Sequence, residues 1–205
     1  MPKIVDKEGK RKQILEAAMR VFARTGVVKT RMAEIAWEAG IGKGTIYEYF
    51  RSKEEMAGAA FTYLFAGFEQ RSARILKDEE DPIRQLERVM QLMYVAFAEE
   101  ASEFVQIFME FWAEAVRLND PKMQKTFDLN AIYEDFRRLF GDIVARGIEA
   151  KRFRPVDARL MACSLIALVD GLFLQWILNR NLFDLKDATT AAIDSILHGL
   201  LLQHD

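Results

Sequence analysis

The sequence predicts an all-α protein of nine helices, with a small N-terminal domain over residues 1–52 and a larger domain over residues 53–205. Apolar residues recur at the three- and four-residue spacing of one helical face, and no stretch shows the two-residue alternation of a strand. The chain is 51% apolar and 29% charged, which is typical of a globular protein and not of a disordered one.

The first three helices are predicted to be separated by glycine turns. The first covers about residues 10–24, and Gly26 closes it as a left-handed cap would. Thr30 is placed to cap the N-terminus of a second helix, which ends at Gly40. A third helix covers about residues 43–50. Two short helices joined across a glycine turn are typical of a helix-turn-helix.

The remaining helices begin at recognisable capping sequences. Ser52 and Glu55 are spaced as a capping box, which starts a long helix reaching about Lys77. Asp81-Pro82 opens a fifth helix with proline in its first turn. Four further helices are expected at about residues 102–118, 123–150, 157–179 and 185–203.

The third helix carries side chains suited to DNA. Ile46 and Phe50 lie one turn apart and are expected to anchor the helix to the first two, which leaves its other face free. On that face Lys43 can donate to guanine or phosphate, and Thr45 can offer a hydroxyl or a methyl group. The reading of Glu48 stays open, because it can accept from cytosine or simply face solvent. Tyr47 and Tyr49 have the length and the donor to hold phosphates.

Charge is distributed unevenly along the chain. The net charge is −2, but residues 1–53 carry +6 and the remaining residues carry −8. A positive end on a negative body favours binding of a polyanion such as DNA at that end.

Other readings of these segments are weaker. Helical patterning alone would also fit an amphipathic hairpin with a solvated outer face. The Gly40–Thr45 segment lacks the spacing of a phosphate-binding loop and follows a helix, not a strand. His198 and His204 are the only histidines, which leaves too few ligands for zinc or di-iron and no triad histidine. We therefore expect no cofactor, no metal site and no catalysis.

Residues 10–56 resemble the DNA-binding domain of TetR-family transcriptional regulators. The resemblance is carried by Ile14-Leu15-Glu16-Ala17-Ala18, Phe22, Gly26, Thr30, Ile35-Ala36, Ala39-Gly40-Ile41, Lys43-Gly44-Thr45-Ile46-Tyr47, Tyr49-Phe50 and Ser52-Lys53-Glu54-Glu55. It implies phosphate and base-edge contacts by Thr30, Arg31, Lys43, Tyr47, Tyr49 and Lys53, with Gly44 and Thr45 nearest the bases. Gly42 and Glu48 depart from the residues frequent in the family, which leaves the operator sequence open.

Aromatic residues in the larger domain form stripes on three predicted helices. Core packing explains any one of them, but together they can also line a ligand cavity. The TetR resemblance implies an effector site among the fourth to eighth helices, and we expect a mostly apolar small molecule there. The candidate effector-binding residues are Phe65, Phe68, Phe104, Phe108, Met109, Trp112, Phe136 and Phe140.

The last two helices are too apolar for a monomer. A two-fold four-helix interface would bury their apolar surface and present two recognition helices to matching half-sites. The candidate interface residues are Leu165, Val169, Phe173, Trp176, Ile193, Ile196, Leu197 and Leu200. The segment 160–178 has the length of a membrane span, but Asp170 near its centre disfavours insertion.

The sequence thus predicts a cytoplasmic, homodimeric, sequence-specific DNA-binding regulator, most simply a repressor released from a palindromic operator by an effector. A single cysteine, Cys163, suits a reducing compartment, and the N-terminus has no apolar signal segment. The alternative is a helical small-molecule-binding protein or enzyme whose N-terminal bundle is only structural.

Overall fold

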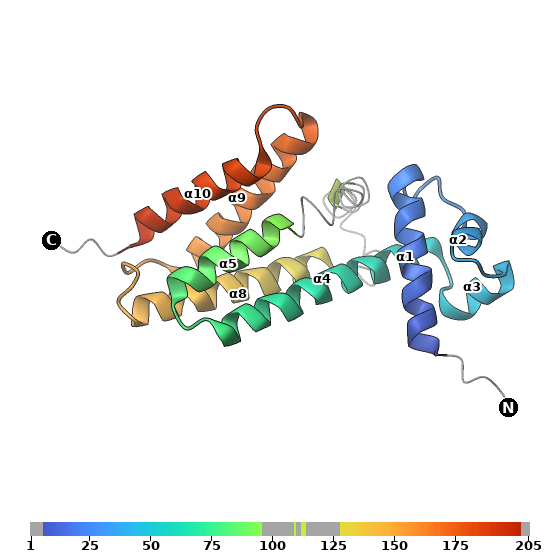
Figure 1. Ribbon diagram of the computed structural model, residues 1–205, viewed down its shortest axis with the longest axis horizontal. Helices are drawn as coiled ribbons and strands as arrows, with labels where there is room; N and C mark the ends of the chain where they lie inside the picture. Colours follow the sequence, from blue (N-terminus) through green and yellow to red (C-terminus); the bar gives the residue numbers. More distant parts are fainter. Residues whose placement is uncertain (1–5, 96–108, 110–111, 114–127, 202–205) are drawn as a thin grey trace. The chain divides into compact units, whose positions relative to one another are not determined.

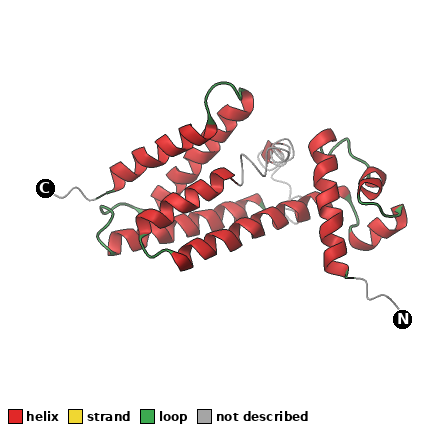
Figure 2. Ribbon diagram, in the orientation of Figure 1, coloured by secondary structure: helices red, strands yellow, loops and turns green. Residues whose placement is uncertain are grey.

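The chain folds into helices, as predicted. The computed structural model describes residues 6–95, 109, 112–113 and 128–201, and every regular element within these ranges is an α-helix (Figure 2). Residues 6–66 belong to one compact unit, whereas residues 67–95 and 130–201 belong to another. Of the predicted sixth helix, residues 102–118, only residues 109, 112 and 113 are described, and Phe104 and Phe108 lie outside the described residues.

The first unit is a three-helix head followed by the start of a long helix (Figure 1). Asp6 caps the first helix by accepting a hydrogen bond from the Gly9 N–H at 2.9 Å. The buried core joins residues from all four helices, with Phe22, Ile46 and Met56 each at 0% exposure. The helices are α1 (Lys7–Thr25), α2 (Met32–Glu38), α3 (Lys43–Tyr49) and α4 (Lys53–Asp78).

Glycines set the turns on either side of α2. Gly40 has φ 64°, the left-handed region that ends a helix without strain only in glycine. Gly26 also has positive φ, 73°, but its ψ of 159° is extended, so it redirects the chain after α1 and is not the left-handed cap that the sequence predicted. Its N–H still closes α1 by donating to the Phe22 carbonyl at 2.7 Å.

The start of α4 is capped from both sides. The Glu55 N–H donates to the Ser52 hydroxyl at 3.1 Å, which is half of the predicted capping box. The Glu55 carboxylate accepts from the Arg51 N–H at 2.8 Å and not from that of Ser52. The predicted domain division at residue 52 falls just before α4, a single helix whose residues belong to both compact units. The division therefore stays a prediction.

The second unit, the body, is built from the helices of two separate segments, residues 67–95 and 130–201 (Figure 1). Its core contains Leu86, Phe140, Ile143 and Leu165, all at 1% exposure or less. The last helix, α10 (Leu185–Leu200), packs against α5 (Pro82–Val95) and α9 (Ala158–Leu178). Besides these three helices and the end of α4, the body contains α8 (Leu129–Glu149).

A buried glutamine closes the connection between α4 and α5. Gln85 is 5% exposed, and its amide nitrogen donates to the carbonyls of Leu76 and Glu79. Its amide oxygen accepts from Arg146 on α8 at 2.8 Å. All of its polar atoms therefore find partners, which fixes the end of α8 against this turn.

Candidate nucleic-acid interface

The two faces of α3 differ as the sequence predicted. Ile46 and Phe50 are buried at 0% and 1% exposure, and they hold the helix against the rest of the head. Tyr47 is 48% exposed, Lys43 is exposed, and Tyr49 is half-buried. Because a large aromatic side chain exposed on a short helix has no core to fill, the outer face of α3 is available to a partner.

The start of α3 leaves room for a close approach by backbone. Gly42 and Gly44 are both exposed, and a Cβ added at Gly44 would meet nothing within 4 Å. Gly42 is the N-cap residue and supplies no side-chain hydrogen bond, as expected for a glycine at this place. Thr45 is half-buried on the first turn.

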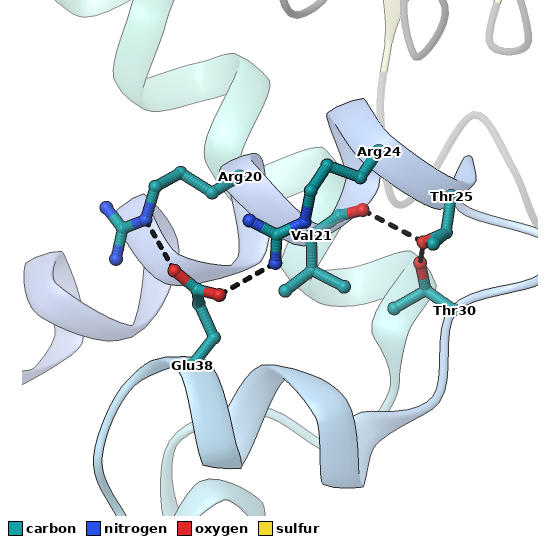
Figure 3. A network of polar contacts seen from close by, with 6 residues as sticks. All are labelled: Arg20, Val21, Arg24, Thr25, Thr30 and Glu38. Atoms are coloured by element: carbon teal, nitrogen blue, oxygen red, sulfur yellow. Dashed lines mark hydrogen bonds and ion pairs between the residues drawn. The ribbon is translucent and has the colours of Figure 1, made fainter.

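Thr30 has a different role from the predicted one. Its side chain is only 2% exposed, and its hydroxyl donates to the Gly26 carbonyl at 2.6 Å. The same hydroxyl lies 2.7 Å from the Thr25 hydroxyl (Figure 3). It neither caps α2 nor reaches the surface, so its side chain braces the loop before α2 and is not available to DNA. The N-cap residue of α2 is the exposed Arg31, whose N–H donates to the Glu34 carboxylate at 2.9 Å.

An ion-pair network that sequence reasoning missed fastens α2 to α1. Glu38 accepts from Arg20 at 2.8 Å and from Arg24 at 2.7 Å, one carboxylate oxygen to each (Figure 3). The Arg20 and Arg24 guanidinium groups hold the pKa of Glu38 below its usual value of 4.5. The spacing of Arg20 and Arg24, one turn apart on the first helix, was the available signal, but nothing in the sequence identified their acidic partner.

Lys53 is also engaged within the head. Its ammonium donates to the carbonyl of Thr30 at 3.1 Å and to that of Val28. It therefore fastens the loop before α2 to the first residue of α4. Since an ammonium has three N–H donors, one remains for the phosphate contact that the family resemblance implies.

Six of the eight predicted effector residues lie within the described part of the chain. Phe68 and Phe136 meet edge to face with ring centroids 5.2 Å apart, and both are buried, as is Phe140. Phe65 is half-buried and stacks on Phe61 in the first unit. Met109 is half-buried and Trp112 is 38% exposed.

A half-buried carboxylate joins α9 to α8. Asp170 on α9 accepts a hydrogen bond from the Tyr133 hydroxyl of α8 at 2.8 Å. Burial raises the pKa of Asp170 above its usual value, although the Tyr133 hydrogen bond opposes the shift. Within the described ranges, no cluster of His, Cys, Asp and Glu is grouped so as to hold a metal ion.

The predicted dimer residues are mostly buried inside the single chain. Six of the eight are core side chains of a single protomer, in which α10 packs on α5 and α9. The prediction that these six face a partner subunit therefore needs correcting. Trp176 stacks on Phe173, with Arg180 4.4 Å above its ring; Trp176 and Ile196 are half-buried. The six residues at 8% exposure or less are Leu165, Val169, Phe173, Ile193, Leu197 and Leu200.

The opposite face of α9 remains exposed. Leu160, Leu174 and Leu178 are 65%, 38% and 78% exposed. With Ser164, Ala167 and Gly171 they follow an alternating four- and three-residue spacing, which is the spacing of a helix-packing seam and a signal that sequence reasoning overlooked. By length and composition α9 is the one described helix that could cross a membrane, but that test is also passed by helices of soluble proteins.

These features define a helix-turn-helix protein of the DNA-binding regulator class. Residues 14–60 match the family model for bacterial regulatory proteins of the tetR family, and residues 82–202 match that for the C-terminal part of BetI-type transcriptional repressors. The second match alone covers more than half of the chain. The chain therefore belongs to the TetR family of transcriptional regulators, as its N-terminal sequence predicted.

Relatives align along nearly the whole length. The HTH-type transcriptional regulator BetI of Pectobacterium atrosepticum is 28% identical over 199 residues, 96% of each chain. A transcriptional regulator of Saccharomonospora viridis, solved in complex with choline, superposes with TM-score 0.83 at 24% identity and covers 96% of this chain and 100% of its own. FadR of Bacillus subtilis, solved with stearoyl-CoA, superposes with TM-score 0.78 at 22% identity, over 92% and 98%.

Proposed function

We propose that this regulator is a cytoplasmic homodimeric repressor, in which each protomer lays α3 in the major groove of one half of a palindromic operator. A small-molecule effector held in the body then releases the operator. The observation that carries the proposal is the exposed surface of α3, where Lys43 and Tyr47 are exposed while Ile46 and Phe50 are buried. No catalytic role is proposed.

The contacts divide by chemistry. Gly44 and Thr45 lie where bases would be approached most closely, since one has no side chain and the other offers a hydroxyl and a methyl group. Tyr47, Tyr49 and Arg31 have donors that suit phosphates and so position the helix. Lys43, at the first turn, can reach either a guanine edge or a phosphate.

Selection from random duplexes with inverted repeats tests DNA recognition. The proposal expects one enriched palindrome, and Tyr47→Ala should weaken binding to it. Tyr63→Ala is the matched control, because Tyr63 is a tyrosine of similar exposure, 41%, on α4. Binding that ignores sequence and is unchanged by Tyr47→Ala would instead favour a purely structural N-terminal bundle.

The proposed dimer uses the exposed face of α9 and not the buried one. Pairing two such faces across a two-fold axis would cover Leu160, Leu174 and Leu178, which a monomer leaves in water. Leu178→Glu should therefore give monomers in sedimentation experiments. Val28→Glu, at an equally exposed apolar residue of the head, should leave the dimer intact. A dimer that survives Leu178→Glu would place the interface elsewhere.

The effector is proposed to be mostly apolar, because the candidate residues Phe68, Phe136 and Phe140 are aromatic and buried in the body. The relatives solved with choline and with stearoyl-CoA differ too much in ligand to identify it. A coupling of about 1–3 kcal/mol between effector and operator binding would make a useful switch. Native mass spectrometry of the purified protein would identify a retained effector. Operator binding is then measured before and after this effector is extracted from the protein. A retained molecule that does not change operator binding would contradict the proposal.

A further inference from the structure

Helix α1 holds both helices of the helix-turn-helix at their C-terminal ends. Gln13 donates to the carbonyl of Ala39, the C-cap residue of α2, at 3.0 Å. Arg11, two residues earlier, donates to the carbonyl of Tyr49, the last residue of α3, at 3.3 Å. The last carbonyls of a helix lack partners within it, so each contact satisfies a group that would otherwise need water.

Arg11 does more at the end of α3 than make one hydrogen bond. The carbon at the centre of its guanidinium group lies 4.3 Å from the centroid of the Phe50 ring. Phe50 is 1% exposed and is the C-cap residue of α3. A planar cation stacked on a fixed ring can point its donors in few directions, and a positive charge at a helix C-terminus is favourable.

This contact is connected directly to the DNA-facing side chains. Tyr49 supplies the carbonyl that Arg11 holds, and Tyr47 lies two residues before it on a helix of seven residues. In so short a helix, a change at the last turn reorients the whole element. One edge of the guanidinium is directed to the Tyr49 carbonyl and one face is covered by the Phe50 ring, which leaves Arg11 poorly placed to act as a phosphate ligand.

We propose that Arg11 is a positioning residue for operator recognition, which sets the orientation of α3 by clamping its C-terminal end and does not itself contact DNA. The inference rests on the proposed operator binding and goes beyond it, since it concerns a residue outside the recognition surface. The head then contains two kinds of basic residue, those that contact DNA directly and one that orients α3.

The test compares Arg11→Gln, Arg11→Lys and Lys7→Gln in the full-length chain. Lys7 is an exposed residue at the start of the same helix, so its substitution removes the same charge without touching α3. Affinity for the selected operator and for an unrelated duplex is measured at several salt concentrations. Hydrogen–deuterium exchange is measured in parallel on the peptide covering residues 43–50.

Positioning has a distinct signature. Arg11→Gln should weaken operator binding about tenfold, from loss of the stacked cation and of its helix-end contact. Binding to the unrelated duplex and the salt slope should not change, because phosphate contacts govern both. Arg11→Lys should resemble Arg11→Gln, since an ammonium keeps the charge but not the planar stack. Exchange at residues 43–50 should quicken in both variants and not in Lys7→Gln.

Other results would overturn the inference. Equal losses on both duplexes, a salt slope lower by about 0.9 and rescue by Arg11→Lys would make Arg11 a phosphate ligand. Unchanged affinity for both duplexes with faster exchange would make it a purely structural residue. If selection enriches no duplex, the proposed function fails, whereas unchanged exchange at residues 43–50 would refute the clamp itself.

Discussion

Replacing Thr30 with valine tests whether this residue acts through the fold or through DNA. Valine has nearly the same shape as threonine but lacks the hydroxyl, whose proton is donated to the Gly26 carbonyl at 2.6 Å. The donated hydrogen bond is lost, worth about 1 kcal/mol. The 2.7 Å contact with the Thr25 hydroxyl is lost as well, but that hydroxyl keeps its hydrogen bond to the Val21 carbonyl at 2.9 Å. The Gly26 carbonyl keeps its contact with the Thr30 N–H at 3.3 Å, so the larger cost of a fully unsatisfied group is avoided.

Urea unfolding followed by circular dichroism measures this loss. The free energy of unfolding should fall by about 1 kcal/mol, equivalent to about 2–4 °C in Tm for a chain of this size. The salt slope of operator binding should not change. Thr45→Val is the matched control, since Thr45 lies on α3: it should weaken operator binding and leave stability intact. Unchanged stability with a salt slope lower by about one unit would show that the Thr30 hydroxyl contacts a phosphate.

Two further substitutions test the packing of the body and the electrostatics of the head. Gly147→Ala should destabilise the protein by about 1–3 kcal/mol in urea unfolding, because the new Cβ would overlap the buried Phe153 ring; Gly67→Ala, with nothing within 4 Å of its new Cβ, should not. Glu38→Gln should destabilise the head at pH 7, because the lowered pKa of Glu38 contributes stability above the usual value of 4.5. That difference from the wild type should disappear as the pH falls through the lowered pKa, and a difference that persists at low pH would contradict it.

The recognition helix was predictable because local sequence determines it. The burial of Ile46 and Phe50 and the exposure of Tyr47 follow from a helical period of 3.6 residues once one face is assigned to the core. Thr30 was not predictable in the same way. Its type suits an N-cap, but a redirected backbone at Gly26 turns its hydroxyl inward to a partner four residues earlier.

The dimer residues show the limit of reasoning from hydrophobicity. Leu165 and Phe173 are large and apolar, which predicts an interface, but those same properties bury them in their own chain. Leu160 and Leu178 are equally apolar but lie on the side of α9 that stays exposed. A helix apolar all round, such as α9, has no polar face to show which side is solvated.

The helical fold, the family and the residues on the outer face of α3 follow from local patterns, because periodicity, caps and glycine turns act over a few neighbouring residues. The three-dimensional packing was needed to find that Glu38 joins two arginines, that Lys53 holds the loop before α2, and that Arg11 meets the end of α3. These contacts join residues 14 to 38 positions apart, and their geometry depends on how the helices pack rather than on any local pattern.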